Sequence, residues 1–140
     1  MYTFETINKI EDFEQTFPLL ALMYPHYSTD DLKKMLHDML PHHYHLLLCK
    51  KNEEIVGLTG FWLGVKFWSG KYCEIDNFII HPDYRNQGIG QLIVAKIVAI
   101  SKQENCKMVA LDAYTHNFKA HKFFYREGFI AKGFHFVKDL

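Results

Sequence analysis

The sequence has 140 residues, of which 49% are hydrophobic and 23% are charged, a balance typical of a globular domain and not of a disordered chain. Its 16 basic residues (Lys and Arg) match its 16 acidic ones, which disfavours nucleic acid and anionic membranes as partners, because proteins that bind them carry a basic excess. Three widely spaced cysteines, Cys49, Cys73 and Cys106, form no C-x-x-C pair, which favours a reducing compartment over a disulfide framework. The chain starts without signal-peptide features and contains no apolar stretch long enough to span a bilayer, so we expect a cytoplasmic protein that does not bind membranes.

No linker, repeat or low-complexity tract divides the chain, so we expect a single domain over residues 1–140. Weak alternation of apolar and polar residues over 2–7 predicts an edge strand. Apolar residues near helical spacing over 11–23 predict a helix, which Pro18 should kink or break.

Ser28 and Asp31 are spaced as in a capping box, which predicts a second helix that runs to Met39. After this helix the spacing of the apolar residues changes from helical periodicity to runs typical of strands, with two further helical stretches among them. The remaining predicted elements are strands over 45–50, 55–63 and 72–80, a helix over 88–105, a strand over 108–113, a helix over 118–127 and a last strand over 129–137. This order predicts an α/β (α+β) fold, with a mixed, mostly antiparallel sheet of about six to seven strands and helices on both faces.

The loop from Arg85 to Gly90 joins a predicted strand to a predicted helix. The first turn of a helix has N–H groups without intrahelical partners and a partial positive charge, which together attract anions. Gly88 and Gly90 lack side chains that would keep a diphosphate away from the backbone, and Arg85 adds a permanent charge with a forked donor. A glycine-rich turn that binds nothing is the alternative. A Walker loop is excluded because no Lys follows Gly90, and a dinucleotide fingerprint is disfavoured because position 93 is Ile.

Two segments resemble a known family. Arg85, Gly88 and Gly90 match the pattern R/Q-x-x-G-x-G/A, and the stretch from Asn117 to Phe129 is similar to N-x-x-A-x-x-F/L-Y-x-x-x-G-F. With both motifs in the right order, the chain resembles the GNAT superfamily of N-acetyltransferases. The resemblance implies acetyl-CoA as co-substrate, no metal, and two adjacent parallel strands that splay apart around the pantetheine arm. The residues implied to contact the cofactor are Phe78, Ile79, Ile80, Arg85, Asn86, Gln87, Gly88, Ile89, Gly90, Gln91, Asn117 and Phe124.

An acceptor amine must lose a proton before it attacks a thioester, which requires a base close to the reacting atoms. Asp76 and Glu74 share one face of a predicted strand. The resemblance implies Asp76 as the catalytic base and places Glu74 toward the acceptor, while a structural carboxylate is the alternative for Asp76.

A Tyr protonates the departing thiolate in many family members. The matching position here is Phe124, and Tyr125 follows it. One helical step turns a side chain by roughly 100°, so Tyr125 is the catalytic proton donor only if the helix is rotated or irregular. Otherwise a water serves, or the thiolate leaves without assistance.

Tyr24, Tyr27 and Trp68 lie in predicted connections that border the acceptor site in the GNAT arrangement. Such rings would suit an amine with an apolar body, or would cover a homodimer interface. His42, His43 and His45 have no nearby Cys or carboxylate to complete a metal site. We therefore expect acetylation of a small-molecule primary amine by direct attack in a ternary complex. The alternatives are acetylation of a protein or peptide amine and a non-catalytic acyl-CoA sensor.

Overall fold

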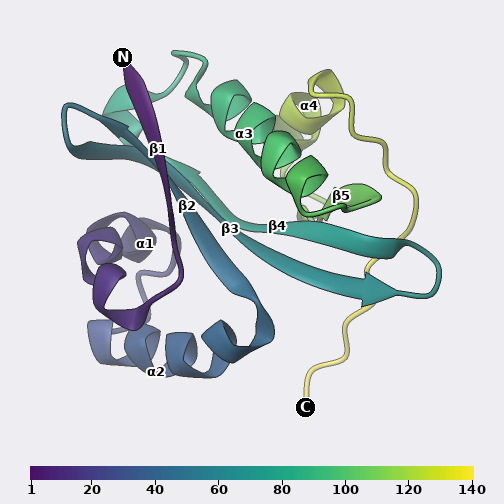
Figure 1. Ribbon diagram of the computed structural model, residues 1–140, viewed down its shortest axis with the longest axis horizontal. Coiled ribbons are helices and arrows are strands. Elements are labelled where there is room, and N and C mark those ends of the chain that lie inside the picture. The colour runs from purple at the N-terminus through teal and green to yellow at the C-terminus, as the bar shows by residue number, and fades with distance from the viewer. The chain divides into compact units, whose positions relative to one another are not determined.

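The computed structural model describes residues 1–140 and contains one sheet with the strand order β1-β2-β3-β4-β5 (Figure 1). The strands are β1 (Tyr2–Ile7), β2 (Tyr44–Lys51), β3 (Glu54–Lys66), β4 (Gly70–Ile80) and β5 (Met108–Leu111). The first four pair antiparallel, and β4 and β5 form the parallel pair. The predicted mixed, mostly antiparallel α/β fold is confirmed, with five strands in place of the six to seven expected.

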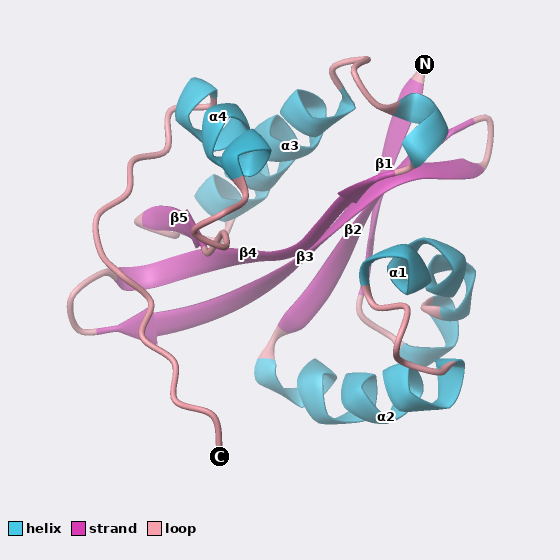
Figure 2. Ribbon diagram, turned by 180° about the vertical axis from the view of Figure 1, so that it is seen from behind, coloured by secondary structure: helices cyan, strands magenta, loops and turns pink.

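Four α-helices accompany the sheet: α1 (Phe17–Met23), α2 (Thr29–Met39), α3 (Ile89–Gln103) and α4 (Phe118–Arg126). The first two helices cover one face of the sheet, and α3 covers the other (Figure 2). The chain divides into two compact units, residues 1–110 and residues 111–140. Helices α1 to α3 belong to the first unit, and α4 belongs to the second.

The helix predicted over residues 11–23 is wrong in its first half. Residues Ile10–Asp12 and Glu14–Thr16 form two short 3-10 turns, and α1 begins only at Phe17. Pro18 lies in the first turn of α1, where its missing N–H costs no hydrogen bond. The proline therefore starts the helix and does not kink it.

The capping box of α2 is confirmed. The Ser28 hydroxyl accepts a hydrogen bond from the Asp31 N–H at 3.1 Å, and the Asp31 carboxylate accepts one from the Ser28 N–H at 2.9 Å. These hydrogen bonds hold the pKa of Asp31 below its ordinary value of 3.8. Two otherwise unpaired donors at the helix start are thereby satisfied.

The centre of the sheet is buried on both faces. Leu46 and Leu48 belong to the core beneath α1 and α2, while Leu47 faces the opposite side, and all three are 0% exposed. Helix α3 packs on that opposite side through Ile93 and Ile97. A Cβ at Gly57 of β3 would meet the Cδ1 atoms of Ile80 and Ile93 at 3.0 and 3.1 Å. The absence of a side chain at Gly57 therefore lets α3 lie close to the sheet.

The strand predicted over 129–137 is not present. Residues 129–140 contain no strand, and residues 130–140 take part in no backbone hydrogen bond. Phe134 and Phe136, which carry the alternating pattern, are 87% and 90% exposed. Alternation describes one face of a strand, but a strand also needs a neighbour for its backbone groups, and the pattern alone does not supply one.

Candidate functional site

Two turns separate the end of β4 from the start of α3. The His81 Nδ1 accepts a hydrogen bond from the Asp83 N–H at 3.2 Å and thereby begins a 3-10 turn over Pro82–Tyr84. Asn86 and Gly88 then adopt positive φ angles of 62° and 79°, a conformation that Asn and Gly reach at the lowest cost. A Cβ at Gly88 would meet no atom within 4 Å. The backbone at the head of α3 is therefore open to an approaching ligand.

The amide N–H groups of residues 88–91, the first four of α3 counted from its N-cap, have no carbonyl partner within the helix. The first paired amide of α3 is that of Leu92, which donates to the Gly88 carbonyl at 3.3 Å. Gly88 and Gln91 are exposed, whereas Ile89 is buried and Gly90 is partly buried. A run of unpaired amides at the positive end of a fifteen-residue helix is the arrangement that binds phosphate groups.

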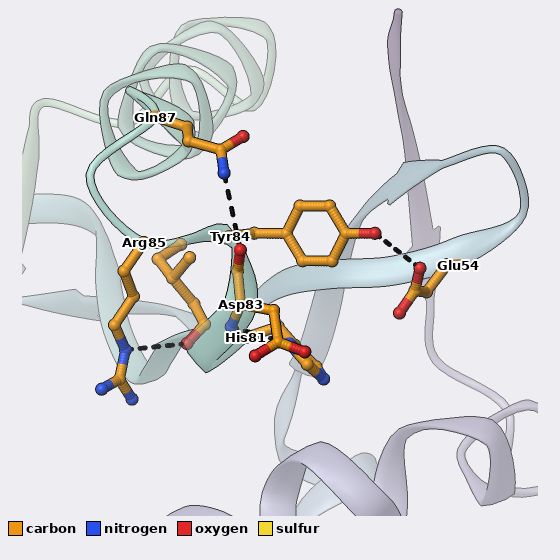
Figure 3. A network of polar contacts seen from close by, with 7 residues as sticks. Glu54, His81, Asp83, Tyr84, Arg85 and Gln87 are labelled. Carbon is orange, nitrogen blue, oxygen red and sulfur yellow. Dashed lines mark hydrogen bonds and ion pairs between the residues drawn. The ribbon is translucent and has the colours of Figure 1, made fainter.

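Side chains tie this loop to its surroundings (Figure 3). The Tyr84 hydroxyl donates to the Glu54 carboxylate at 2.7 Å, linking the loop to the start of β3. That hydrogen bond also raises the pKa of Tyr84, so the phenol stays protonated as a donor. Arg85 donates through Nε to the Ile80 carbonyl at 3.4 Å, and its terminal nitrogens have no partner. The guanidinium charge is therefore available to an anion.

Strand β4 extends past the end of β5. The contact between β4 and β5 begins where the Lys107 N–H donates to the Lys71 carbonyl at 2.7 Å. Strand β5 has 4 residues, whereas β4 has 11. Counted from that contact, Phe78 to Ile80 lie beyond the last residue of β5. Phe78, Ile79 and Ile80, the residues expected along the pantetheine arm, fall in this stretch. Ile79 packs in the core beneath α1 and α2, and Ile80 approaches Gly57.

A β-bulge interrupts β4 at the predicted base. Leu58 of β3 pairs with Ile79 of β4, and Gly60 pairs with Asp76. Only Thr59 lies between the two β3 residues, whereas Asn77 and Phe78 lie between the two β4 residues. Asn77 within the bulge has a φ of 50°. The Asp76 carboxylate accepts a hydrogen bond from the Asn77 N–H at 2.8 Å and another from the Trp62 indole N–H at 3.0 Å. Asp76 is partly buried and fixed in orientation.

Two tyrosines hold the side chain of Asn77. The Tyr44 hydroxyl donates to Asn77 Oδ1 at 2.7 Å, and Asn77 Nδ2 donates to the Tyr24 hydroxyl at 2.6 Å. Burial raises the pKa of Tyr44, and the nearby Asp76 carboxylate raises it further. Asn77, Tyr44 and Trp62 were not among the residues expected from the sequence. The signal that could have found them is the adjacent polar pair Asp76 and Asn77, which breaks the alternation of apolar and polar residues along this strand.

The structure brings some expected acceptor residues to this bulge and leaves another away from it. Tyr24 contacts Asn77, and the Tyr27 ring centroid lies 6.1 Å from that of Tyr24. Glu74 shares the strand face of Asp76 by its spacing of two residues. Trp68, however, is 70% exposed in the turn before β4. Six residues of strand, roughly 20 Å, separate Gly70 from Asp76, so Trp68 is not brought to the bulge.

The expected residues of the second unit lie on or beside α4. Asn117 caps this helix, because its Oδ1 accepts a hydrogen bond from the Ala120 N–H at 3.2 Å. Phe124 packs edge-on against Phe129, with ring centroids 5.5 Å apart. Tyr125 is 59% exposed, whereas Ala120 and Phe124 are partly buried. Asn117, expected on the same side as Ala120 and Phe124, is exposed like Tyr125, so the side of α4 that faces the cofactor stays a prediction.

Two other kinds of site were considered in the whole chain. No group of three or more His, Cys, Asp or Glu side chains is placed to hold a metal ion. None of the helices combines the length and the apolar character needed to cross a membrane.

An α/β fold with unpaired amides at the head of a helix is an arrangement that suits a phosphate-bearing ligand. Comparison with known proteins gives the family. The model of the acetyltransferase (GNAT) family matches residues 7–129. The chain therefore belongs to the GNAT family of acetyltransferases, and the resemblance found in the sequence is confirmed.

Curated relatives and a solved structure agree with this assignment. A Bacillus subtilis (strain 168) protein with the provisional name ribosomal protein bS18-alanine N-acetyltransferase is 24% identical over 91% of this chain and 83% of its own. The aminoalkylphosphonate N-acetyltransferase of Salmonella typhimurium (strain LT2) is 29% identical over 74% and 68%. The aminoglycoside enzyme AAC(6')-Iy, solved with a CoA bisubstrate analogue, superposes with a TM-score of 0.86 at 15% identity, covering 100% and 99% of the two chains.

Proposed function

We propose that this acetyltransferase moves the acetyl group of acetyl-CoA onto the primary amine of a small molecule, by direct attack in a ternary complex. The observation that carries the proposal is the set of unpaired amides at the head of α3, residues 88–91. The diphosphate of coenzyme A suits these donors, because its oxygens can accept several of them at once. The unpaired terminal nitrogens of Arg85 would add charge-assisted hydrogen bonds. The segment Phe78 to Ile80 then leads from the loop to the bulge along the part of β4 that lies beyond β5.

Asp76 is suited to accept the proton of the acceptor amine. The ammonium first gives one proton to the Asp76 carboxylate, directly or through a water, which leaves a free amine. The amine nitrogen then forms a bond to the acetyl carbon, the carbon–sulfur bond breaks, and sulfur leaves as the thiolate of coenzyme A. The second proton that the nitrogen loses as the amide forms passes to the thiolate, directly or through a water. Hydrogen bonds from Trp62 and the Asn77 amide hold that carboxylate in place, which is the preorganisation that a general base requires.

The cysteines support direct attack over a covalent acyl-enzyme. Burial raises the pKa of Cys49 and of Cys73 to about 11. Only the thiolate is a good nucleophile, so these buried thiols are inert at neutral pH. Burial raises the pKa of Cys106 as well. All three thiols are free, which also supports a reducing, cytoplasmic setting.

The acceptor is proposed from the chemistry around the bulge. Tyr24 and Tyr27 supply aromatic surface beside the Asp76 and Glu74 carboxylates, a combination that suits an ammonium group on an apolar body. Among the relatives, the aminoalkylphosphonate enzyme supports a small amine. The Bacillus relative supports the second candidate, the N-terminal amine of a protein that begins with alanine.

One assay compares these candidates. The protein is incubated with acetyl-CoA and one amine at a time, and the free thiol of coenzyme A is followed with a thiol reagent. The amines are an aminoalkylphosphonate, an aminoglycoside, thialysine and a short peptide with N-terminal alanine. We expect the highest kcat/KM with a small amine. A higher kcat/KM for the peptide would replace the proposed acceptor, and coenzyme A binding without turnover on any amine would favour the sensor function.

A further inference from the structure

The hydrogen bonds around Asn77 join distant parts of the first unit. Tyr24 follows α1, Tyr44 begins β2, and Asn77 lies in β4. Trp62 of β3 contacts the neighbouring Asp76. None of these contacts belongs to the regular pairing of the sheet. Their common feature is that all of them act on the two bulge residues.

The direction of the two side-chain hydrogen bonds is fixed by chemistry. An amide offers one acceptor oxygen and one donor nitrogen, whereas a phenol can donate or accept. Burial keeps Tyr44 protonated, because its pKa is raised, so Tyr44 can donate to Asn77 Oδ1. The Asn77 Nδ2 then faces the Tyr24 oxygen and donates to it. An ionised aspartate at position 77 would accept from Tyr44 but could not donate to Tyr24.

The bulge has little freedom to rearrange. Asn77 holds a positive φ of 50°, which costs a residue with a side chain roughly 1 kcal/mol and is tolerated best by Asn. On the neighbouring strand β3, a Cβ at Gly60 would overlap the Tyr44 hydroxyl and Asn77 Oδ1. The space that a side chain at position 60 would need is therefore filled by the Tyr44–Asn77 hydrogen bond.

We propose that Asn77 is a positioning residue for Asp76, and that its side-chain contacts with Tyr24 and Tyr44 hold the bulge in the conformation that orients the carboxylate. The link between the two residues is the Asn77 N–H, which donates to Asp76 Oδ1 at 2.8 Å. Rotation of the Asn77 backbone would break that hydrogen bond. Tyr24 extends the connection to the segment between α1 and α2, so the acceptor side and the base share one rigid unit. This inference rests on the function proposed above.

The first test compares Asn77→Asp with Asn77→Ala in the dependence of kcat/KM on pH, using the amine that wild type acetylates fastest. A second carboxylate beside Asp76 disfavours the ionised form of Asp76. Asn77→Asp should therefore move the acidic limb of the plot of kcat/KM against pH to higher pH by about one unit. Asn77→Ala adds no charge and should leave the limb in place while kcat falls about tenfold. The other titratable groups named around the bulge are Tyr24, Tyr27, Tyr44 and Glu74. These groups, and the charged residues of α2, which covers the same face of the sheet, are common to both variants.

The control variant is Asn105→Asp. Asn105 also has a positive φ, 60°, but lies exposed after α3. Its acidic limb and kcat should equal those of wild type. An unchanged kcat in Asn77→Ala, or equal limbs in Asn77→Asp and wild type, would overturn the positioning role.

A second readout needs no substrate. Hydrogen exchange of the residue 77 amide should be at least tenfold faster in Tyr24→Phe and Asn77→Ala than in wild type, because the amide loses its fixed acceptor. The amides of Leu46 to Leu48 should exchange at wild-type rates, which shows that both variants are folded. If wild type acetylates no amine, the proposed function fails, and this comparison alone decides the positioning role. Equal exchange at residue 77 in all three proteins would overturn it.

Discussion

The loop at the head of α3 and the bulge in β4 are built from different parts of the chain. The loop offers the backbone N–H groups of residues 88–91, and residues 85–88 are exposed. The bulge offers side chains from four separate segments, and Tyr44, which anchors it, is 3% exposed. A backbone site depends on conformation and tolerates changes of side chain, whereas a site made of side chains depends on single atoms.

This contrast predicts that substitution of single atoms will damage the bulge most. Asp76→Asn removes the base but retains one carbonyl oxygen, and we expect kcat to fall at least about 100-fold, within the range for loss of a general base. The dissociation constant of acetyl-CoA should remain at the wild-type value. Steady-state kinetics and calorimetry measure the two quantities. A kcat within threefold of wild type would assign Asp76 a structural role only.

At the loop, charge should matter more than shape. Gly88→Asp and Gly88→Asn have nearly the same shape, both residues tolerate a positive φ, and a Cβ there meets no atom within 4 Å. Only Asp repels a diphosphate, so we expect coenzyme A to bind about 100-fold more weakly to Gly88→Asp than to Gly88→Asn, from a like-charge contact near the surface. The control is Gly133→Asp, where a Cβ also meets nothing. Equal affinities for the two Gly88 variants would show that the diphosphate binds elsewhere.

A smaller effect is expected at Tyr125 in the second unit. Its side chain is 59% exposed on α4, so we expect Tyr125→Phe to lower kcat by less than tenfold. The measurement is kcat at saturating acetyl-CoA and amine, with the affinity for acetyl-CoA as control. A hundredfold loss of kcat with intact affinity would identify Tyr125 as the proton donor after all.

The smallest effect should come from the contact that ties the loop to the sheet. Tyr84→Phe removes the 2.7 Å hydrogen bond to Glu54 but leaves every loop amide in place. An exposed hydrogen bond of this kind contributes little to stability because water competes for both partners, so coenzyme A affinity should fall no more than about fivefold. Calorimetry of Tyr84→Phe and Glu54→Gln measures this loss. A loss as large as that of Gly88→Asp would mean that side chains, and not the backbone, set the shape of the loop.

The two regions also differ in how far the sequence could predict them. The loop follows from local signals, because Gly88 and Gly90 mark the helix start within six residues of Arg85. The capping box of Ser28 and Asp31 is equally local. The contacts of Asn77 join residues 33 and 53 positions apart, and no local pattern specifies such pairs. The prediction of a strand over 129–137 was wrong for a related reason. The alternation of apolar and polar residues in this segment does not specify which other strand it would pair with.

The central claim is that the amides of residues 85–91 bind the diphosphate of coenzyme A. The most direct measurement is a titration of the ¹⁵N-labelled protein, followed by the amide resonances of this loop, with coenzyme A and separately with pantetheine, which lacks the diphosphate. The account predicts large, saturable shifts at residues 85–91 with coenzyme A and small ones with pantetheine. Loop resonances that stay in place while coenzyme A binds, or that shift equally with both compounds, would contradict it.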